Sequence, residues 1–100
     1  METKAQMHEW KQVSPTLLKY YGGYMHYCPG CENLHPLPDS WQFDGNVHYP
    51  TFSPSFMQNR GCQSQCHYFV QQGQLVYCAD SNHPLAGHTI PMPALPEWAV

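Results

Sequence analysis

The feature that most constrains this chain is its shortage of large aliphatic side chains. Leu, Ile, Val and Phe together make up only 17 of its 100 residues. Chains this poor in such residues are disordered when they also carry a high net charge, but here the formal net charge is −3 and the sequence has seven Tyr and three Trp. A domain of this size buries too little apolar surface to fold easily on aliphatics alone, so we expect a bound metal to stabilise it.

Charge and hydropathy exclude several classes of function. Four Lys and Arg, scattered along the chain, do not form the basic surface that nucleic-acid binding requires. No apolar run is long enough to span a membrane, and residues 1–12 lack the apolar core of a secretory signal. Five cysteines are an odd number, which argues against a disulfide framework. We therefore expect one domain over residues 1–100 in a reducing, cytoplasmic compartment.

Local patterns predict a mostly β fold, either small β or α+β. Residues 2–12 predict a short helix within an N-terminal segment 1–20. Strands are predicted at 24–27, 41–43 and 47–49, a proline-rich loop at 28–40, an edge or irregular segment at 51–55, a hairpin over 66–78 with a three-residue loop at 71–73, and an extended Pro-rich tail at 91–100. These elements are short, which is typical of a metal-stabilised β domain.

The sequence Cys28-Pro29-Gly30-Cys31 is the strongest chemical motif. Two thiolates at this spacing can bind one ion, and the glycine permits the tight turn of a zinc-ribbon knuckle. The alternative is a thioredoxin-like redox pair, but this requires a helix after the first cysteine, and prolines follow instead. The motif therefore predicts a zinc site.

Two further ligands must come from the C-terminal half. Cys66 begins the predicted hairpin, and His83 follows its second strand in a loop that can turn the ring inward. The predicted ligand set is therefore Cys28, Cys31, Cys66 and His83 around one Zn²⁺.

Other residues remain candidates for the same site. His35 could replace His83, and His67 or Cys78 could replace Cys66 or His83. A three-residue hairpin loop would put Cys78 opposite Cys66 on the same face, where we interpret it as a core neighbour. Cys62 lies in a loop and is interpreted as a free thiol.

Five blocks of sequence resemble a family of small, uncharacterised zinc-binding proteins of tailed phages and prophages. They are Cys28-Pro29-Gly30-Cys31 with His35, Trp41-x-Phe43, the segment Pro50-Thr51-Phe52-Ser53-Pro54-Ser55, Cys66-His67-x-Phe69, and Asp80-Ser81-Asn82-His83-x-Leu85-Ala86-Gly87. The resemblance spans roughly residues 24–96. It implies a zinc-binding fold in the host bacterial cytoplasm, and adds His35, His67 and Asp80 to the predicted ligands as positions that matter. Many family members have Cys where this chain has Ser81.

The function expected from these observations is protein–protein interaction. A phage-encoded, zinc-stabilised protein would bind an unidentified host bacterial protein and inhibit a defence system such as restriction or CRISPR; nucleic acid and membrane partners are not expected. The first alternative is a small zinc- or cysteine-dependent hydrolase, with Cys66 as nucleophile and His83 or His35 as base. The second is a nucleic-acid-binding zinc module. No catalytic residue is assigned, and a non-enzymatic role is favoured.

Overall fold

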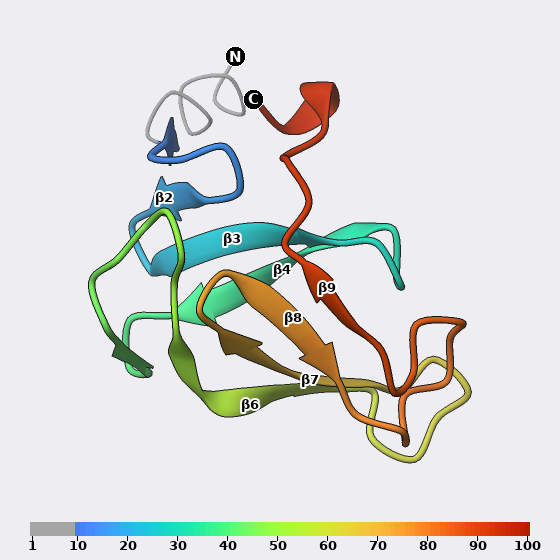
Figure 1. Cartoon of the computed structure of the whole chain (residues 1–100). Helices are drawn as coiled ribbons and strands as arrows, with labels where there is room; N and C mark the ends of the chain where they lie inside the picture. The colour runs from blue at the N-terminus through green and yellow to red at the C-terminus, as the bar shows by residue number, and fades with distance from the viewer. Residues whose placement is uncertain (1–9) are drawn as a thin grey trace.

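The computed structural model describes residues 10–100, and these form a β protein (Figure 1). In chain order its strands are β1 (Lys11–Gln12), β2 (Leu18–Tyr20), β3 (Gly23–Cys28), β4 (Asn33–Pro38), β5 (Gln42–Phe43), β6 (Phe52–Gln58), β7 (Cys66–Gln71), β8 (Gln74–Tyr77) and β9 (Thr89–Pro91), followed by a 3₁₀ turn, η1 (Glu97–Ala99). The prediction of a mostly β fold is confirmed. Among residues 10–100 no helix is long and apolar enough to cross a membrane.

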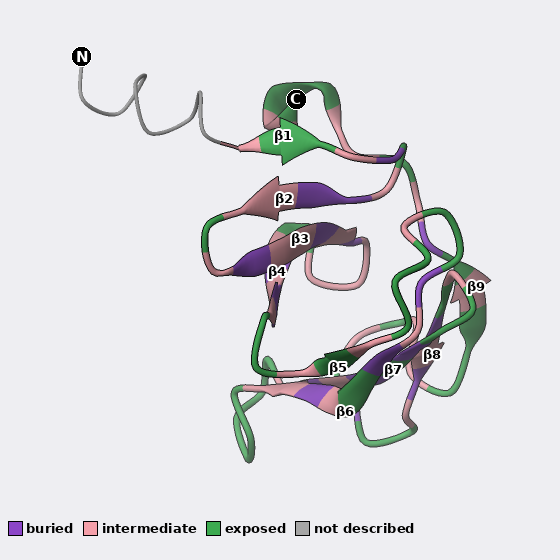
Figure 2. Cartoon of the chain, turned by 90° about the vertical axis from the view of Figure 1, so that its left-hand side faces the viewer, coloured by how far each residue is buried: buried purple, intermediate pink, exposed green. Residues whose placement is uncertain are grey.

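The strands form two antiparallel sheets, which Figure 2 shows one above the other. The first has the order β1-β2-β3-β4 and the second the order β5-β6-β7-β8-β9. Each strand pairs with its neighbour in sequence, so no connection within a sheet crosses over another strand. The tail crosses between the sheets, because the Met92 amide donates to the Gly73 carbonyl and the Leu95 amide donates to the Pro15 carbonyl.

Aromatic rings and thiols fill the core in place of the missing aliphatics. The buried cluster consists of Leu17, Cys28, Leu37, Phe52, Phe56, Cys66, Tyr68, Val70, Leu75, Tyr77 and Met92. Phe56 stacks on Tyr68 with ring centroids 4.9 Å apart, and Tyr68 packs edge-on against Tyr77. The core draws on both sheets, and two of its cysteines lie where the sheets meet.

The predicted loop at 28–40 is wrong, because Asn33–Pro38 is strand β4. This strand tolerates its prolines because it lies at the edge of its sheet, next to β3 only. Pro36 and Pro38 are two residues apart, so their nitrogens share one edge of the strand and leave the ladder to β3 intact. The turn that remains between β3 and β4 is the segment containing Cys31.

Four other element predictions change. The predicted helix 2–12 lies mostly outside the described residues, and its last two residues form β1. The predicted strand 47–49 is a series of bends, and the chain returns instead as β6. Strand β6 is irregular as predicted, with a register shift between Phe52 and Phe56, but it lies between β5 and β7 and is not an edge. The predicted tail begins with the last residue of β9 and ends in η1.

The 66–78 hairpin is confirmed, but its loop has two residues and not three. Gln72 and Gly73 both have positive φ, 50° and 77°, and Gln71 pairs with Gln74. This turn suits a two-residue hairpin loop. A change of one residue in register moves a side chain to the other face of the sheet. Cys78 therefore lies opposite His67 and not opposite Cys66, as the bond from the Cys78 amide to the His67 carbonyl shows.

Candidate active site and metal centre

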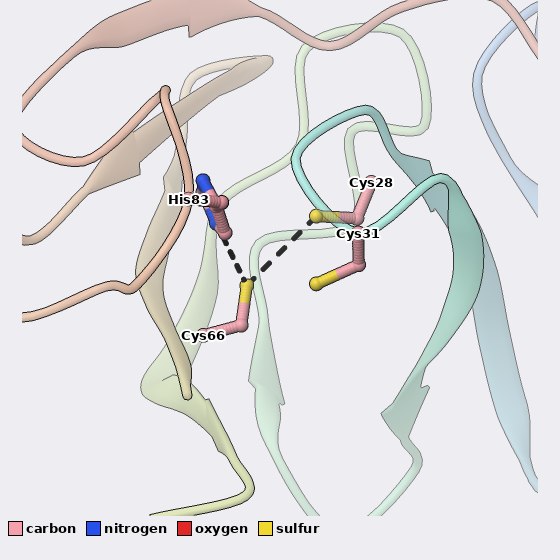
Figure 3. Close-up of side chains that lie close together, drawn as sticks. All are labelled: Cys28, Cys31, Cys66 and His83. Atoms are coloured by element: carbon pink, nitrogen blue, oxygen red, sulfur yellow. Dashed lines mark hydrogen bonds between the residues drawn. The ribbon is translucent and has the colours of Figure 1, made fainter. Parts of the chain in front are cut away.

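The four predicted zinc ligands lie together where the two sheets meet. One ligand atom from each of Cys28, Cys31, Cys66 and His83 lies within 4.8 Å of the others, and Figure 3 shows the side chains converging. The Cys28 and Cys66 sulfurs are 3.9 Å apart, and His83 Nε2 is 3.4 Å from Cys66 Sγ. This geometry allows one metal ion to be held by three sulfurs and one nitrogen, a typical structural zinc set.

Each ligand is delivered by a different local feature. Cys28 ends β3, Cys31 lies in the turn that follows, and Cys66 begins β7 with its side chain directed inward. Gly30 makes room for His83, because a Cβ at this position would lie 2.6 Å from both ring nitrogens. A hollow of about 370 Å³, bordered by Cys31 and His83, gives an ion access to the cluster.

Hydrogen bonds favour a thiolate at Cys28. The pKa of Cys28 falls to about 3, chiefly because the Cys66 thiol donates to its sulfur, with a smaller contribution from the Tyr77 hydroxyl. The same interaction raises the pKa of Cys66. The Tyr77 hydroxyl lies 3.0 Å from Cys28 Sγ. A buried site that already stabilises negative charge on sulfur is suited to a cation.

His83 has a second hydrogen bond that bears on metal binding. The Leu85 amide donates to His83 Nδ1, at 3.2 Å, so in this arrangement the proton of the neutral ring lies on Nε2 and points to Cys66. A metal at Nε2 would replace that proton and shift the ring to the Nδ1–H form.

His35 lies outside this cluster. It pairs with His26 across β3 and β4, and both rings bond the Tyr68 hydroxyl, His26 Nε2 at 2.6 Å and His35 Nδ1 at 3.0 Å. Burial, with a smaller effect from His35, lowers the pKa of His26 to about 4, so this ring is neutral. His35 Nε2 is buried without a hydrogen-bond partner. These histidines support the core behind Cys28.

A Ser–His–Asp arrangement lies on the second sheet, on the face of β7 opposite to the one that carries Cys66. Ser55 Oγ is 3.1 Å from His67 Nε2, and His67 Nδ1 is 3.1 Å from Asp80 Oδ1. With Asp80 accepting the Nδ1 proton, Nε2 is free to accept the hydroxyl proton of Ser55. These distances and roles match a catalytic triad, which is recognised by geometry and not by sequence position.

The surrounding backbone holds His67 in place. The Ser81 hydroxyl accepts a bond from the His67 amide and donates one to its carbonyl, both 2.9 Å long. The loop after β8, which carries Asp80, is also held in place, because the Gln65 side chain donates a hydrogen bond to the Asp80 carbonyl at 2.8 Å. Ser81, the position at which many members of the resembling phage family have Cys, thus fixes the backbone of His67.

The triad is open to solvent. The His67 side chain is 23% exposed and that of Asp80 is 52% exposed. Ser55 is half-buried on β6. Ser53, two residues earlier, borders a hollow of about 450 Å³ together with Phe43 and Asp44. A substrate can therefore reach Ser55 from the outer face of the sheet.

Sequence reasoning selected four residues that the structure brings together, Cys28, Cys31, Cys66 and His83, but missed the Ser–His–Asp arrangement. His67 and Asp80 were singled out as candidate metal ligands or as family positions and not as a catalytic pair, and Ser55 only as part of a block. The order Ser, His, Asp in the last half of the chain was the available signal. It was hidden because His67 was considered as a metal ligand in place of Cys66 or His83, whereas it lies on the opposite face of β7 from Cys66.

Comparison with known proteins identifies the family. Residues 2–78 match the family described as bacterial ubiquitination-like system serine protease (BubE), so the chain belongs to this family. The match contains Ser55 and His67, while Asp80 and His83 follow directly after it. No curated protein and no solved structure matches the chain.

The family corrects two expectations. It is a bacterial serine protease family and not the phage zinc-binding family of unknown function that the sequence blocks resemble. The prediction of a phage-encoded inhibitor of host defence is therefore wrong.

Proposed function

We propose that this member of the BubE family is a serine protease in which Ser55 is the nucleophile, His67 the general base and Asp80 the residue that orients His67. The observation that carries the proposal is the unbroken chain of contacts from Ser55 Oγ through both nitrogens of His67 to Asp80. It supports the hydrolase alternative in a different form from the one expected, with a serine in place of Cys66 or a metal-bound water.

The reaction follows from these contacts. Ser55 Oγ attacks the carbonyl carbon of the scissile bond while its proton passes to His67 Nε2. The protonated His67, stabilised by Asp80 at Nδ1, then gives this proton to the leaving amine, and an acyl-enzyme remains on Ser55. Water enters, His67 takes one of its protons, and the resulting hydroxide equivalent releases the acid and restores Ser55.

The substrate class follows from the open face and the family description. We propose cleavage of a peptide or isopeptide bond in a protein of a bacterial ubiquitination-like system. Ser55 lies on an exposed sheet surface and not at the bottom of a deep pocket, which favours an extended, flexible segment of a protein over a small molecule. The hollow beside Ser53 offers a place for one substrate side chain.

The metal has a structural role in this proposal. Cys28, Cys31, Cys66 and His83 would hold one Zn²⁺ with four protein ligands, which leaves no open position for catalysis. The ion would join the β3–β4 turn to β7 and to the loop that also carries Asp80. Thiolate ligands remain reduced in the bacterial cytoplasm, the proposed compartment.

A fluorophosphonate probe tests the proposal without knowledge of the substrate. The probe reacts only with an activated serine, so the zinc-loaded protein should gain one adduct on Ser55, located by peptide mass spectrometry. Ser55→Ala should remove the adduct. Ser40→Ala is the matched control, because Ser40 is exposed in the turn between β4 and β5 and lies outside the triad. An adduct on another serine, or none on correctly folded protein, would refute the assignment.

A further inference from the structure

The face of the sheet that carries the triad also holds a cysteine that the proposed reaction does not use. The two-residue hairpin loop places Cys78 opposite His67, with the Cys78 amide bonded to the His67 carbonyl at 2.9 Å. Opposed residues on neighbouring strands have side chains on the same face and Cβ atoms roughly 5 Å apart. Cys78 therefore lies beside the imidazole, and Asp80 folds back to the same ring.

These three side chains form a second group of metal-ligand type. One ligand atom each from His67, Cys78 and Asp80 lies within 4.8 Å of the others. In a tetrahedral zinc site the ligand atoms are roughly 3.3–3.8 Å apart, so small side-chain rotations would complete the geometry. Nitrogen, thiolate sulfur and carboxylate oxygen are all zinc ligands, and the partly exposed His67 and Asp80 leave an approach from solvent.

We propose that His67, Cys78 and Asp80 form an inhibitory site for a thiophilic divalent cation such as Zn²⁺, and that an ion bound there switches the serine protease off. The inhibition rests on the proposed function of the triad, whereas binding of the ion to these three residues does not depend on catalysis. The site is separate from the buried cluster of Cys28, Cys31, Cys66 and His83, because it lies on the opposite face of β7.

The inhibition follows from the two nitrogens of His67. Nδ1 faces Asp80 and carries the proton in the active triad, whereas Nε2 faces Ser55 and must accept a proton. A metal on Nδ1 displaces that proton, and the neutral ring then keeps its proton on Nε2. In this form His67 donates to Ser55 and cannot act as its base. The ion also occupies the Asp80 carboxylate.

The test uses protein already loaded with one equivalent of zinc in the buried cluster. The rate of fluorophosphonate labelling at Ser55 is measured while free Zn²⁺, or Cd²⁺ as a second probe, is raised. We expect labelling of the wild type to fall and to recover when a weak chelator removes the added ion. Cys78→Ser should label at the wild-type rate without added metal and require at least about tenfold more zinc for the same inhibition.

Cys62→Ser is the matched control. Cys62 is also a free cysteine of the described chain, but it is exposed and belongs to neither cluster, so its loss should leave the zinc response unchanged. If Cys78→Ser and the wild type are inhibited at the same zinc concentration, the proposed site is wrong. Cys78→Ala serves as a second variant if the serine substitution lowers the melting temperature.

A binding measurement separates this inference from the proposed function. Co²⁺ added to the zinc-loaded protein should bind as a second equivalent with a sulfur-to-cobalt charge-transfer band that Cys78→Ser abolishes. If Ser55 is never labelled but this band appears, the protease proposal fails and the metal site stands. If Ser55 is labelled and no band appears in the wild type, the protease proposal stands and the metal site is overturned.

Discussion

The two faces of strand β7 carry different chemistries that depend on the same backbone. Cys66 points inward, is fully buried and joins the four-residue metal cluster. His67, its neighbour, points outward, is partly exposed and joins Ser55 and Asp80. Side chains alternate along a strand, so adjacent residues can belong to two sites that never touch. The inner site suits stability, and the outer site suits reaction with a substrate.

The loop after β8 repeats this division. Asp80 reaches the outer face and contacts His67, while His83, three residues later, turns inward to Cys66. Strand β7 and the loop after β8 therefore each supply one residue to both sites. This arrangement predicts an asymmetry between the two sites. Loss of a ligand in the inner site should abolish both the stability that the metal supplies and the reaction at Ser55. Loss of a side chain in the outer site should abolish only the reaction.

The largest expected effect comes from Cys28→Ser. A structural zinc contributes on the order of 10 kcal/mol to folding, comparable to the whole stability of a typical domain. We expect loss of bound zinc, loss of the cooperative thermal transition in circular dichroism, and loss of Ser55 labelling together. Cys62→Ser, the exposed control, should keep all three. A Cys28→Ser protein that melts at the wild-type temperature with its zinc in place would show that Cys28 is not a ligand of a stabilising metal.

Ser55→Ala should affect only the outer site. Removal of a triad nucleophile typically lowers the rate by about 10⁴-fold or more, so labelling and proteolysis should fall below detection. The half-buried hydroxyl bonds only His67 in the described chain, so the melting temperature and zinc content should remain those of the wild type. Parallel melts and metal analysis check this. A Ser55→Ala protein that still cleaves protein substrate would end the triad assignment.

Asp80→Asn should have a smaller effect on the same face. The amide cannot accept the Nδ1 proton in the way the carboxylate does, so His67 loses its preferred orientation and tautomer. We expect a rate reduction of about 10²–10⁴-fold, lower than for a buried aspartate because Asp80 is half exposed. The labelling rate measures the effect. Zinc stoichiometry should not change, and a variant that loses its zinc would show that the two faces are not separable.

Gly30→Ala should weaken the inner site without abolishing it. The new Cβ would lie 2.6 Å from the His83 ring nitrogens, so the ring must shift. We expect about 10–100-fold weaker zinc affinity, measured by competition with a chromogenic chelator. Gly22→Ala is the control, because Gly22 likewise has no positive φ and its added Cβ would meet the flexible ring of Tyr20 and not the metal cluster. Equal zinc affinity in both variants would mean that His83 does not bind the ion.

The sequence revealed the inner site more readily than the outer one. The C-x-x-C spacing identified Cys28 and Cys31 as candidate ligands. Cys66 and His83 were then inferred from their positions at the start of a strand and in a loop. The triad has no such spacing, because Ser55, His67 and Asp80 come from three segments that only the folded sheet brings together. The fold class was predictable from turns and β-rich runs, whereas strand β4 was not, since its tolerance of prolines depends on its place at a sheet edge.

The hairpin loop shows how small a difference decides a site. A loop of three residues would have placed Cys78 with Cys66 in the core, and the actual loop, Gln72-Gly73, places it beside His67. Glycine at the second position made a positive φ predictable there. A positive φ at Gln72 was not predictable, because glutamine has no special tolerance for this conformation.

The central claim is that a metal-held strand presents the catalytic histidine to Ser55, and one measurement tests it directly. Zinc content and the rate of fluorophosphonate labelling at Ser55 are followed in the same sample while a strong chelator removes the metal. The account predicts that labelling declines in step with the loss of the buried zinc and that Ser55 no longer reacts in the metal-free protein. Full labelling of Ser55 in protein that contains no metal would contradict it.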